Sequence, residues 1–119
     1  SPAMNFLEGR YLLSGDHADI RLTDGMLVAT GKAKAIEPGA MVTIGIRPEH
    51  VVLSQDGMEA DVDLIEPTGF GVILHLSLRG LPLKVFTLDR EALHASGTVR
   101  VSFPAARLHV FDETGKRAD

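Results

Sequence analysis

The chain has 119 residues, of which 45% are hydrophobic and 24% charged, with a net charge of −4 and no cysteine. This composition is typical of one globular domain, and it excludes disulfides and thiolate metal sites. The negative charge and the small number of aromatic residues argue against a nucleic-acid binder, which normally carries a basic face and stacking aromatics. No apolar run approaches the ~20 residues that cross a bilayer, and the first residues lack the pattern of a secretory signal, so we expect a soluble protein.

Alternation of apolar and polar residues predicts several short strands. The clearest alternating segments are residues 42–47, 59–64, 72–79 and 99–103. In each segment one set of side chains is expected in a core and the other set at the surface. The pattern is weaker in the first forty residues, where residues 32–36 fit either a strand or a loop.

Turn signals separate the alternating segments. The candidate hairpin turns are Asp24-Gly25, Asp56-Gly57 and Arg79-Gly80, and the longer turns are Glu37-Pro38-Gly39 and Glu66-Pro67-Thr68-Gly69. Asp89 is expected to cap one short helix over residues 90–95, which Gly97 would end in the left-handed conformation. These elements predict an all-β fold, a small OB-like barrel of short antiparallel strands with one short helix, in a single domain over residues 1–119.

The sequence lacks the common phosphate-binding and acyl-transfer motifs. The segment Gly31-Lys32-Ala33 has neither the correctly spaced first glycine nor the hydroxyl residue of a P-loop, and no Gly-x-Ser-x-Gly elbow occurs. The segment Gly69-Phe70-Gly71 precedes a predicted strand, so we interpret it as a turn. We therefore predict no catalytic residue and no cofactor-binding residue in this chain.

The candidate metal ligands are poorly arranged. The five histidines are scattered, and none has the i, i+4 spacing of a helical zinc site. Glu59, Asp61 and Asp63 share one face of a predicted strand, where their carboxylates would diverge instead of surrounding a cation. We predict no metal site.

The segment Arg47-Pro48-Glu49-His50 stands out because it places three polar side chains around a proline between two apolar runs. Pro48 cannot donate a ladder hydrogen bond, so the chain must bend here or lie at a sheet edge. One interpretation is a charged corner between strands. The other is a surface contact on a stiffened backbone, in which Arg47 binds a carboxylate.

Four segments occur together in an order that resembles one family. They are SPAMNFLEG, IGIRPEHVVL, VDLIEPTGFGVILHL and LHVFDETGKR. The chain resembles the C-terminal regulatory domain, a TOBE or OB-like domain, of the ATP-binding subunits of carbohydrate ABC importers of the maltose, multiple-sugar and glycerol-phosphate type. The resemblance implies a fragment that holds no cofactor, since ATP and magnesium would bind only to an upstream nucleotide-binding domain.

The resemblance also implies a function and an interface. It implies a non-catalytic regulatory and dimerisation domain that forms a homodimer, meets the membrane subunits through the upstream domain and receives, in some members, a regulatory protein, but no nucleic acid. It implies a cytoplasmic location at the inner face of the membrane. The residues that match the family's motifs, and that we predict at the interface, are Arg47, Glu49, His50, Glu66, His109, Phe111 and Asp112.

An alternative is a module that binds an oxyanion or small effector, as in molybdate- and sulfate-type transporters. Those relatives carry a motif similar to Ser-Ala-Arg-Asn, whereas this chain reads Ala3-Met4-Asn5-Phe6 without the arginine. The donors available for such a ligand are Thr68, Gly69, Gly71 and Lys84.

Overall fold

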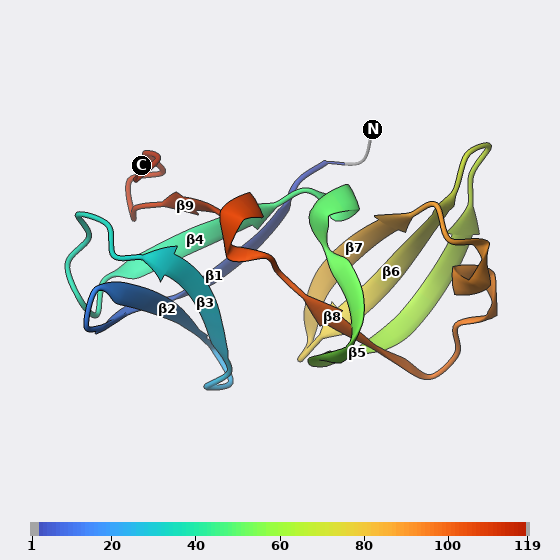
Figure 1. The fold of residues 1–119 in the computed structure, drawn as a ribbon, viewed down its shortest axis with the longest axis horizontal. Helices are drawn as coiled ribbons and strands as arrows, with labels where there is room; N and C mark the ends of the chain where they lie inside the picture. The colour runs from blue at the N-terminus through green and yellow to red at the C-terminus, as the bar shows by residue number, and fades with distance from the viewer. Residues whose placement is uncertain (1–2, 119) are drawn as a thin grey trace. The chain divides into compact units, whose positions relative to one another are not determined.

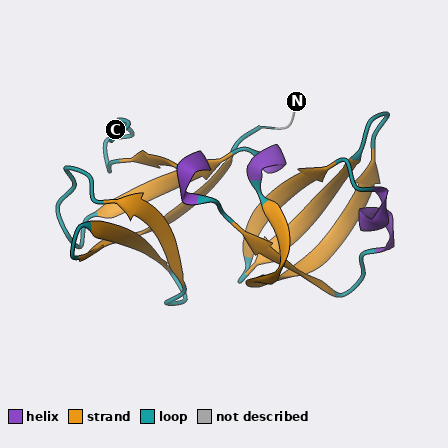
Figure 2. Cartoon of the chain, in the orientation of Figure 1, coloured by secondary structure: helices purple, strands orange, loops and turns teal. Residues whose placement is uncertain are grey.

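The computed structural model describes residues 3–118, which are almost entirely β-structure (Figures 1 and 2). The strands are β1 (Asn5–Ser14), β2 (His17–Leu22), β3 (Leu27–Lys32), β4 (Met41–Ile46), β5 (Val52–Pro67), β6 (Val72–Leu78), β7 (Leu81–Thr87), β8 (Thr98–Ser102) and β9 (His109–Phe111). Three short 3₁₀ helices lie between them: η1 (Pro48–His50), η2 (Arg90–His94) and η3 (Ala105–Arg107). The predicted all-β class is confirmed.

The chain divides into two compact units. Unit 1 comprises residues 3–5 and 47–104 and contains a four-stranded sheet in the order β7-β6-β5-β8. Unit 2 comprises residues 6–46 and 105–118 of the described part and contains a five-stranded sheet in the order β3-β2-β1-β4-β9. That residues 1–119 form a single domain stays a prediction.

Each unit has its own apolar core. In unit 1 the fully buried side chains are Val72, Leu74, Leu78, Val85 and Val101, with Leu76 and Leu83 nearly so. In unit 2 they are Tyr11, Ile20, Ile44 and Ile46, with Val42 and Val110 nearly so. The sheet of unit 1 curls around its core as a half-barrel (Figure 1), so the alternate side chains of its strands lie on the outer face.

The β6–β7 hairpin follows its sequence signal closely. Its loop residues Arg79 and Gly80 both have positive φ, 53° and 85°, as a two-residue turn of the predicted kind requires. Residues in β6 alternate between buried and half-buried along the whole strand, which confirms the predicted inward face.

The predicted helix forms in shortened form. It is a 3₁₀ helix that ends at His94, and Asp89 caps it by accepting a hydrogen bond from the Glu91 N–H at 3.0 Å. Gly97 has a φ of 71°, the left-handed conformation expected at that position.

Two expectations for β5 were wrong, because the strand contains two irregularities. Asp56-Gly57 is not a hairpin turn, because β5 runs through it and pairs with β8 on both sides of a bulge between Leu53 and Met58. Leu64 does not point into the core, since a second irregularity between Val62 and Leu64 shifts the alternation. Residues 54–57 are extra in β5, because Leu53 and Met58 both pair with Val101. Asp63 is a single extra residue, so Leu64 beyond it changes face.

Candidate functional site

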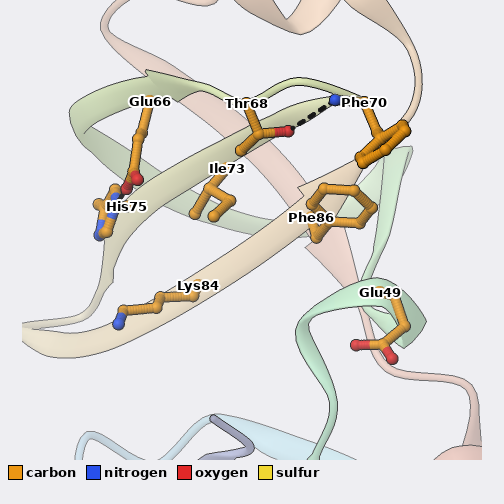
Figure 3. A pocket seen from close by; sticks show the side chains of 8 residues that line it. All are labelled: Glu49, Glu66, Thr68, Phe70, Ile73, His75, Lys84 and Phe86. Atoms are coloured by element: carbon orange, nitrogen blue, oxygen red, sulfur yellow. Dashed lines mark hydrogen bonds and ion pairs between the residues drawn. The ribbon is translucent and has the colours of Figure 1, made fainter. Parts of the chain in front are cut away.

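The outer face of unit 1 carries a groove of about 660 Å³ (Figure 3). The β5–β6 turn, strands β6 and β7 and the helix η1 supply its walls and floor. The lining side chains are Glu49, Glu66, Thr68, Phe70, Ile73, His75, Lys84 and Phe86. All of them belong to unit 1.

Strand register places the floor of the groove. Ile73 in β6 lies opposite Glu66 in β5 and Phe86 in β7, so these three side chains form a row across the sheet. His75 and Lys84 are paired in the next row. The floor is therefore apolar at Ile73 and Phe86, with charged groups along one side (Figure 3).

A hydroxyl-stabilised turn places Phe70 above the floor. The Thr68 Oγ1 accepts hydrogen bonds from the N–H groups of Phe70 at 3.2 Å and Gly71 at 2.8 Å, and donates one to the Gly71 carbonyl at 3.0 Å. This side-chain bonding fixes the turn locally. Phe70 is 88% exposed, although it is a large apolar side chain.

The groove contains one histidine–carboxylate contact and two charged side chains that have no partner in residues 3–118. The Nε2 of His75 lies 2.8 Å from the Oε1 of Glu66. Within the described part of the chain, neither the Glu49 carboxylate nor the Lys84 ammonium has a hydrogen-bond or ion-pair partner. These two groups are therefore available to a ligand or partner.

The Arg47-Pro48-Glu49-His50 segment forms the helix η1. Pro48 occupies its first turn and is buried, and the His50 N–H donates to the Arg47 carbonyl at 2.9 Å. This turn directs Glu49 into the groove, whereas Arg47 is exposed outside it. The ring of His50 is half-buried and does not line the groove, and its Nδ1 has no hydrogen-bond partner in the described residues.

His109, Phe111 and Asp112, which the sequence also singled out, lie in unit 2. Phe111 packs edge-to-face on Phe6, with 6.1 Å between the ring centroids. The Asp112 Oδ1 accepts hydrogen bonds from the hydroxyl and the N–H of Thr114, at 2.5 and 2.9 Å, and from the Lys116 N–H at 3.0 Å. The Thr114 hydroxyl bond is the main cause of a lowered pKa at Asp112. His109 lies in β9 opposite Gly45 of β4.

Of the predicted interface residues, only Glu49 and Glu66 line the groove. Thr68 and Lys84 are donors expected from the sequence, whereas the sequence did not predict that Phe70, Ile73, His75 and Phe86 belong to one site. A usable signal was present, because Ile73 and Phe86 are large apolar residues at strand positions that alternate with the core positions. Residues 3–118 contain no cluster of three or more His, Asp or Glu side chains placed to hold a metal ion, and no helix long and apolar enough to span a membrane.

Comparison with protein families identifies the chain's relatives. Residues 1–51 match the family described as "MalK OB fold domain", and residues 44–111 match the one described as "TOBE domain". The chain belongs to the TOBE domain family. The TOBE match contains every residue that lines the groove.

Curated relatives of this TOBE domain are sn-glycerol-3-phosphate import ATP-binding proteins. The chain is 34% identical over 121 aligned residues to the UgpC protein of Salmonella paratyphi A, and 36% identical to that of Ruegeria sp.. Each alignment covers 98% of the chain but only 33% and 32% of the relative. The chain thus spans about a third of the length of these relatives.

A solved structure shares the fold. The TOBE domain is similar to the cytoplasmic molybdate-binding protein ModG, crystallised with molybdate bound, with a TM-score of 0.72 over 89% of this chain and 94% of that one. The sequences are 15% identical. The likeness therefore shows the fold alone.

Proposed function

We propose that this TOBE domain is the non-catalytic regulatory and dimerisation domain of the ATP-binding subunit of a sugar-type ABC importer. The observation that carries the proposal is that 98% of the chain aligns with one third of proteins named as sn-glycerol-3-phosphate import ATP-binding subunits. The sequence itself has no P-loop, so ATP and magnesium would bind in another part of the full protein.

The proposed role is mechanical. Two copies of the domain would stay associated while the nucleotide-binding domains close on ATP and reopen. The tether raises the effective concentration of one ATPase half near the other. A regulatory protein that bound the open arrangement more tightly would inhibit transport by shifting that population.

Charge and exposure suggest where two copies would meet. Arg47 is exposed at the start of η1, two residues before Glu49, whose carboxylate has no partner in the described part of the chain. A two-fold axis makes one patch contact itself, so Arg47 of each copy would face an acidic residue of the other. Glu49 suits this role better than Asp112, whose Oδ1 already accepts three hydrogen bonds.

Sedimentation equilibrium of the 119-residue chain over a wide concentration range tests this proposal. We expect a concentration-dependent dimer that Arg47→Glu weakens about tenfold, because charge reversal replaces an attraction by a repulsion at two symmetry-related places. Arg10→Glu and Arg21→Glu in unit 2 are the matched controls, and the double reversal Arg47→Glu/Glu49→Arg should restore association. Equal effects at Arg47 and Arg21, or a monomer at all concentrations, would contradict the assignment.

The alternative, an oxyanion-binding module, is tested in the same experiment by adding molybdate. The free ammonium of Lys84 favours an anion in the groove, whereas the carboxylates of Glu49 and Glu66 repel one. We expect association to be indifferent to molybdate. Association driven by molybdate would move the protein to the ligand-binding class.

A further inference from the structure

The groove continues into a second depression on the same unit. This depression, of about 490 Å³, shares Glu49 and Phe86 with the groove. It is lined by Glu49, Val51, Val52, Leu53, Phe86, Thr87, Leu88 and Asp89. The residues lining the two depressions together are called the Phe70–Leu88 surface below.

Three large apolar side chains that line the Phe70–Leu88 surface are exposed to solvent. Phe70 is 88% exposed, Leu88 69% and Val52 43%. Single exposed apolar residues are normal on a protein, but several that line two depressions with shared walls mark an interaction site.

The shape of this surface favours a protein partner over a small molecule. Small-ligand sites are concave and enclose most of the ligand. Here the large side chains of Phe70 and Leu88 remain largely in solvent and would be covered only by a broad partner. Aromatic and aliphatic anchors at the centre, with charges at the rim, are the usual composition of a protein–protein contact.

The charges lining the surface indicate what that partner presents. Three lining residues are carboxylates, Glu49, Glu66 and Asp89, whereas Lys84 is the one ammonium. Glu66 is paired with His75, and Asp89 accepts the capping hydrogen bond of η2. Glu49 has no partner in the described residues and, like Phe86, lines both depressions.

The position of Glu49 favours a partner with a cationic group, because Glu49 lines both depressions whereas Lys84 lines only the first. In the dimer proposed above, Arg47 of the second copy would occupy Glu49, so a docked cation would compete with that contact. A Lys or Arg side chain would pair with Glu49 and could also lie over the ring of Phe86 or Phe70.

We propose that the Phe70–Leu88 surface docks a segment of another protein that presents large apolar side chains next to Arg or Lys. The apolar anchors fill the depressions over Ile73 and Phe86, and the cation binds Glu49. The inference rests on the proposed function in one respect, since such a partner would be a regulator of the importer. The contacts of the apolar anchors and of the cation at Glu49 do not depend on the proposed function.

Selection of a random 12-residue peptide library, displayed on phage, against the immobilised 119-residue chain tests the inference. We expect the enriched sequences to place Leu, Phe or Trp beside Arg or Lys. Enrichment of acidic sequences, or no enrichment at all, would overturn the proposal.

Fluorescence anisotropy of the most enriched peptide then locates the contact. We expect Phe70→Ser and Glu49→Lys each to raise the Kd about tenfold or more. Leu27→Ser and Glu37→Lys are matched exposed controls in unit 2 and should change the Kd less than about twofold. The Kd of the wild-type protein for the peptide should also rise with salt concentration, because salt screens the attraction between Glu49 and the cation of the peptide.

The ¹⁵N NMR spectrum of each variant verifies that the fold is intact, and peptide-induced shifts in the wild-type protein should centre on residues 69–71 and 84–88. Binding that Phe70→Ser and Glu49→Lys leave unchanged would overturn the proposal. So would a wild-type dimer that Phe70→Ser dissociates, because the surface would then belong to a second copy.

The two proposals fail in different ways. A protein that is monomeric at all concentrations but binds basic apolar peptides contradicts the dimerisation function and leaves the docking surface standing. If Arg47→Glu weakens a dimer but no peptide is enriched, the dimerisation function stands and the docking surface is contradicted.

Discussion

The side chain of Asn5 takes the place of a neighbouring strand at one edge of the unit 1 sheet. Its Nδ2 donates to the Lys84 carbonyl and its Oδ1 accepts from the Lys84 N–H, both at 2.8 Å. Strand β7 is an edge strand, so these backbone groups have no strand partner on that side. The asparagine of the Ser-Pro-x-Met-Asn-Phe motif thus has a structural role, which protects an edge that could otherwise pair with another chain.

We expect Asn5→Ala to lower the free energy of unfolding by about 1–3 kcal/mol, because it leaves a partly buried donor and acceptor of Lys84 unsatisfied. Urea unfolding followed by far-UV circular dichroism measures the change. Gln55→Ala is the matched control, since Gln55 is an exposed amide and should change stability by less than about 0.5 kcal/mol. Similar losses for the two variants would mean that the Asn5 bonds contribute nothing to stability.

At the scale of elements, the sequence predicts those strands and turns whose geometry depends on residues close together in the chain. The alternation of β6 and the Arg79-Gly80 turn both depend on short-range geometry, and both are confirmed. The other features of the strands depend on pairing between segments that are far apart in the sequence. Whether Asp56-Gly57 forms a turn or a bulge depends on whether β8 pairs with β5 on both sides of it, which the local sequence does not reveal.

The candidate site shows the same limit. Family motifs pointed to Glu49 and Glu66, and both line the groove. The apolar floor was missed because it arises from the β5–β6–β7 register, which brings Ile73 beside Phe86. Phe70 was interpreted as a turn residue, which is correct, but its exposure depends on the turn geometry that Thr68 fixes.

The bulge in β5 explains why a glycine is present at position 57. A Cβ atom there would lie 2.3 Å from the Val101 carbonyl oxygen and 2.8 Å from its nitrogen. Because these are backbone atoms of the paired strand β8, they cannot move aside without disturbing the sheet. The signal that suggested a hairpin turn therefore reflects a close approach of two strands.

We expect Gly57→Ala to destabilise the protein by about 1–3 kcal/mol through this clash. Gly69→Ala is the matched control, because nothing lies within 4 Å of its Cβ position. That substitution should be neutral within about 0.5 kcal/mol. Urea unfolding measures the stability of both variants. If Gly57→Ala and Gly69→Ala were equally stable, β5 and β8 could move apart at residue 57 without loss of stability.

At the scale of the whole molecule, the chain crosses between two units that each bury their own side chains. Leu74 is fully buried in unit 1 and Ile44 in unit 2. Tyr11, the one tyrosine of the chain, is fully buried in unit 2, where its hydroxyl accepts a hydrogen bond from the Lys34 N–H at 2.7 Å. Its fluorescence therefore reports on unit 2 alone.

Two core truncations test whether these units unfold together, and so whether the predicted single domain is correct. We expect Leu74→Ala and Ile44→Ala each to cost about 2–5 kcal/mol, because each leaves a cavity in a filled core. Since each core is built within one unit, amide hydrogen exchange should lose protection mainly in the unit that carries the substitution. Leu74→Ala should then leave the urea midpoint of Tyr11 fluorescence nearly unchanged, whereas Ile44→Ala should lower it. If either variant reduced protection equally throughout residues 3–118, the two units would form one cooperative domain, as the sequence predicted.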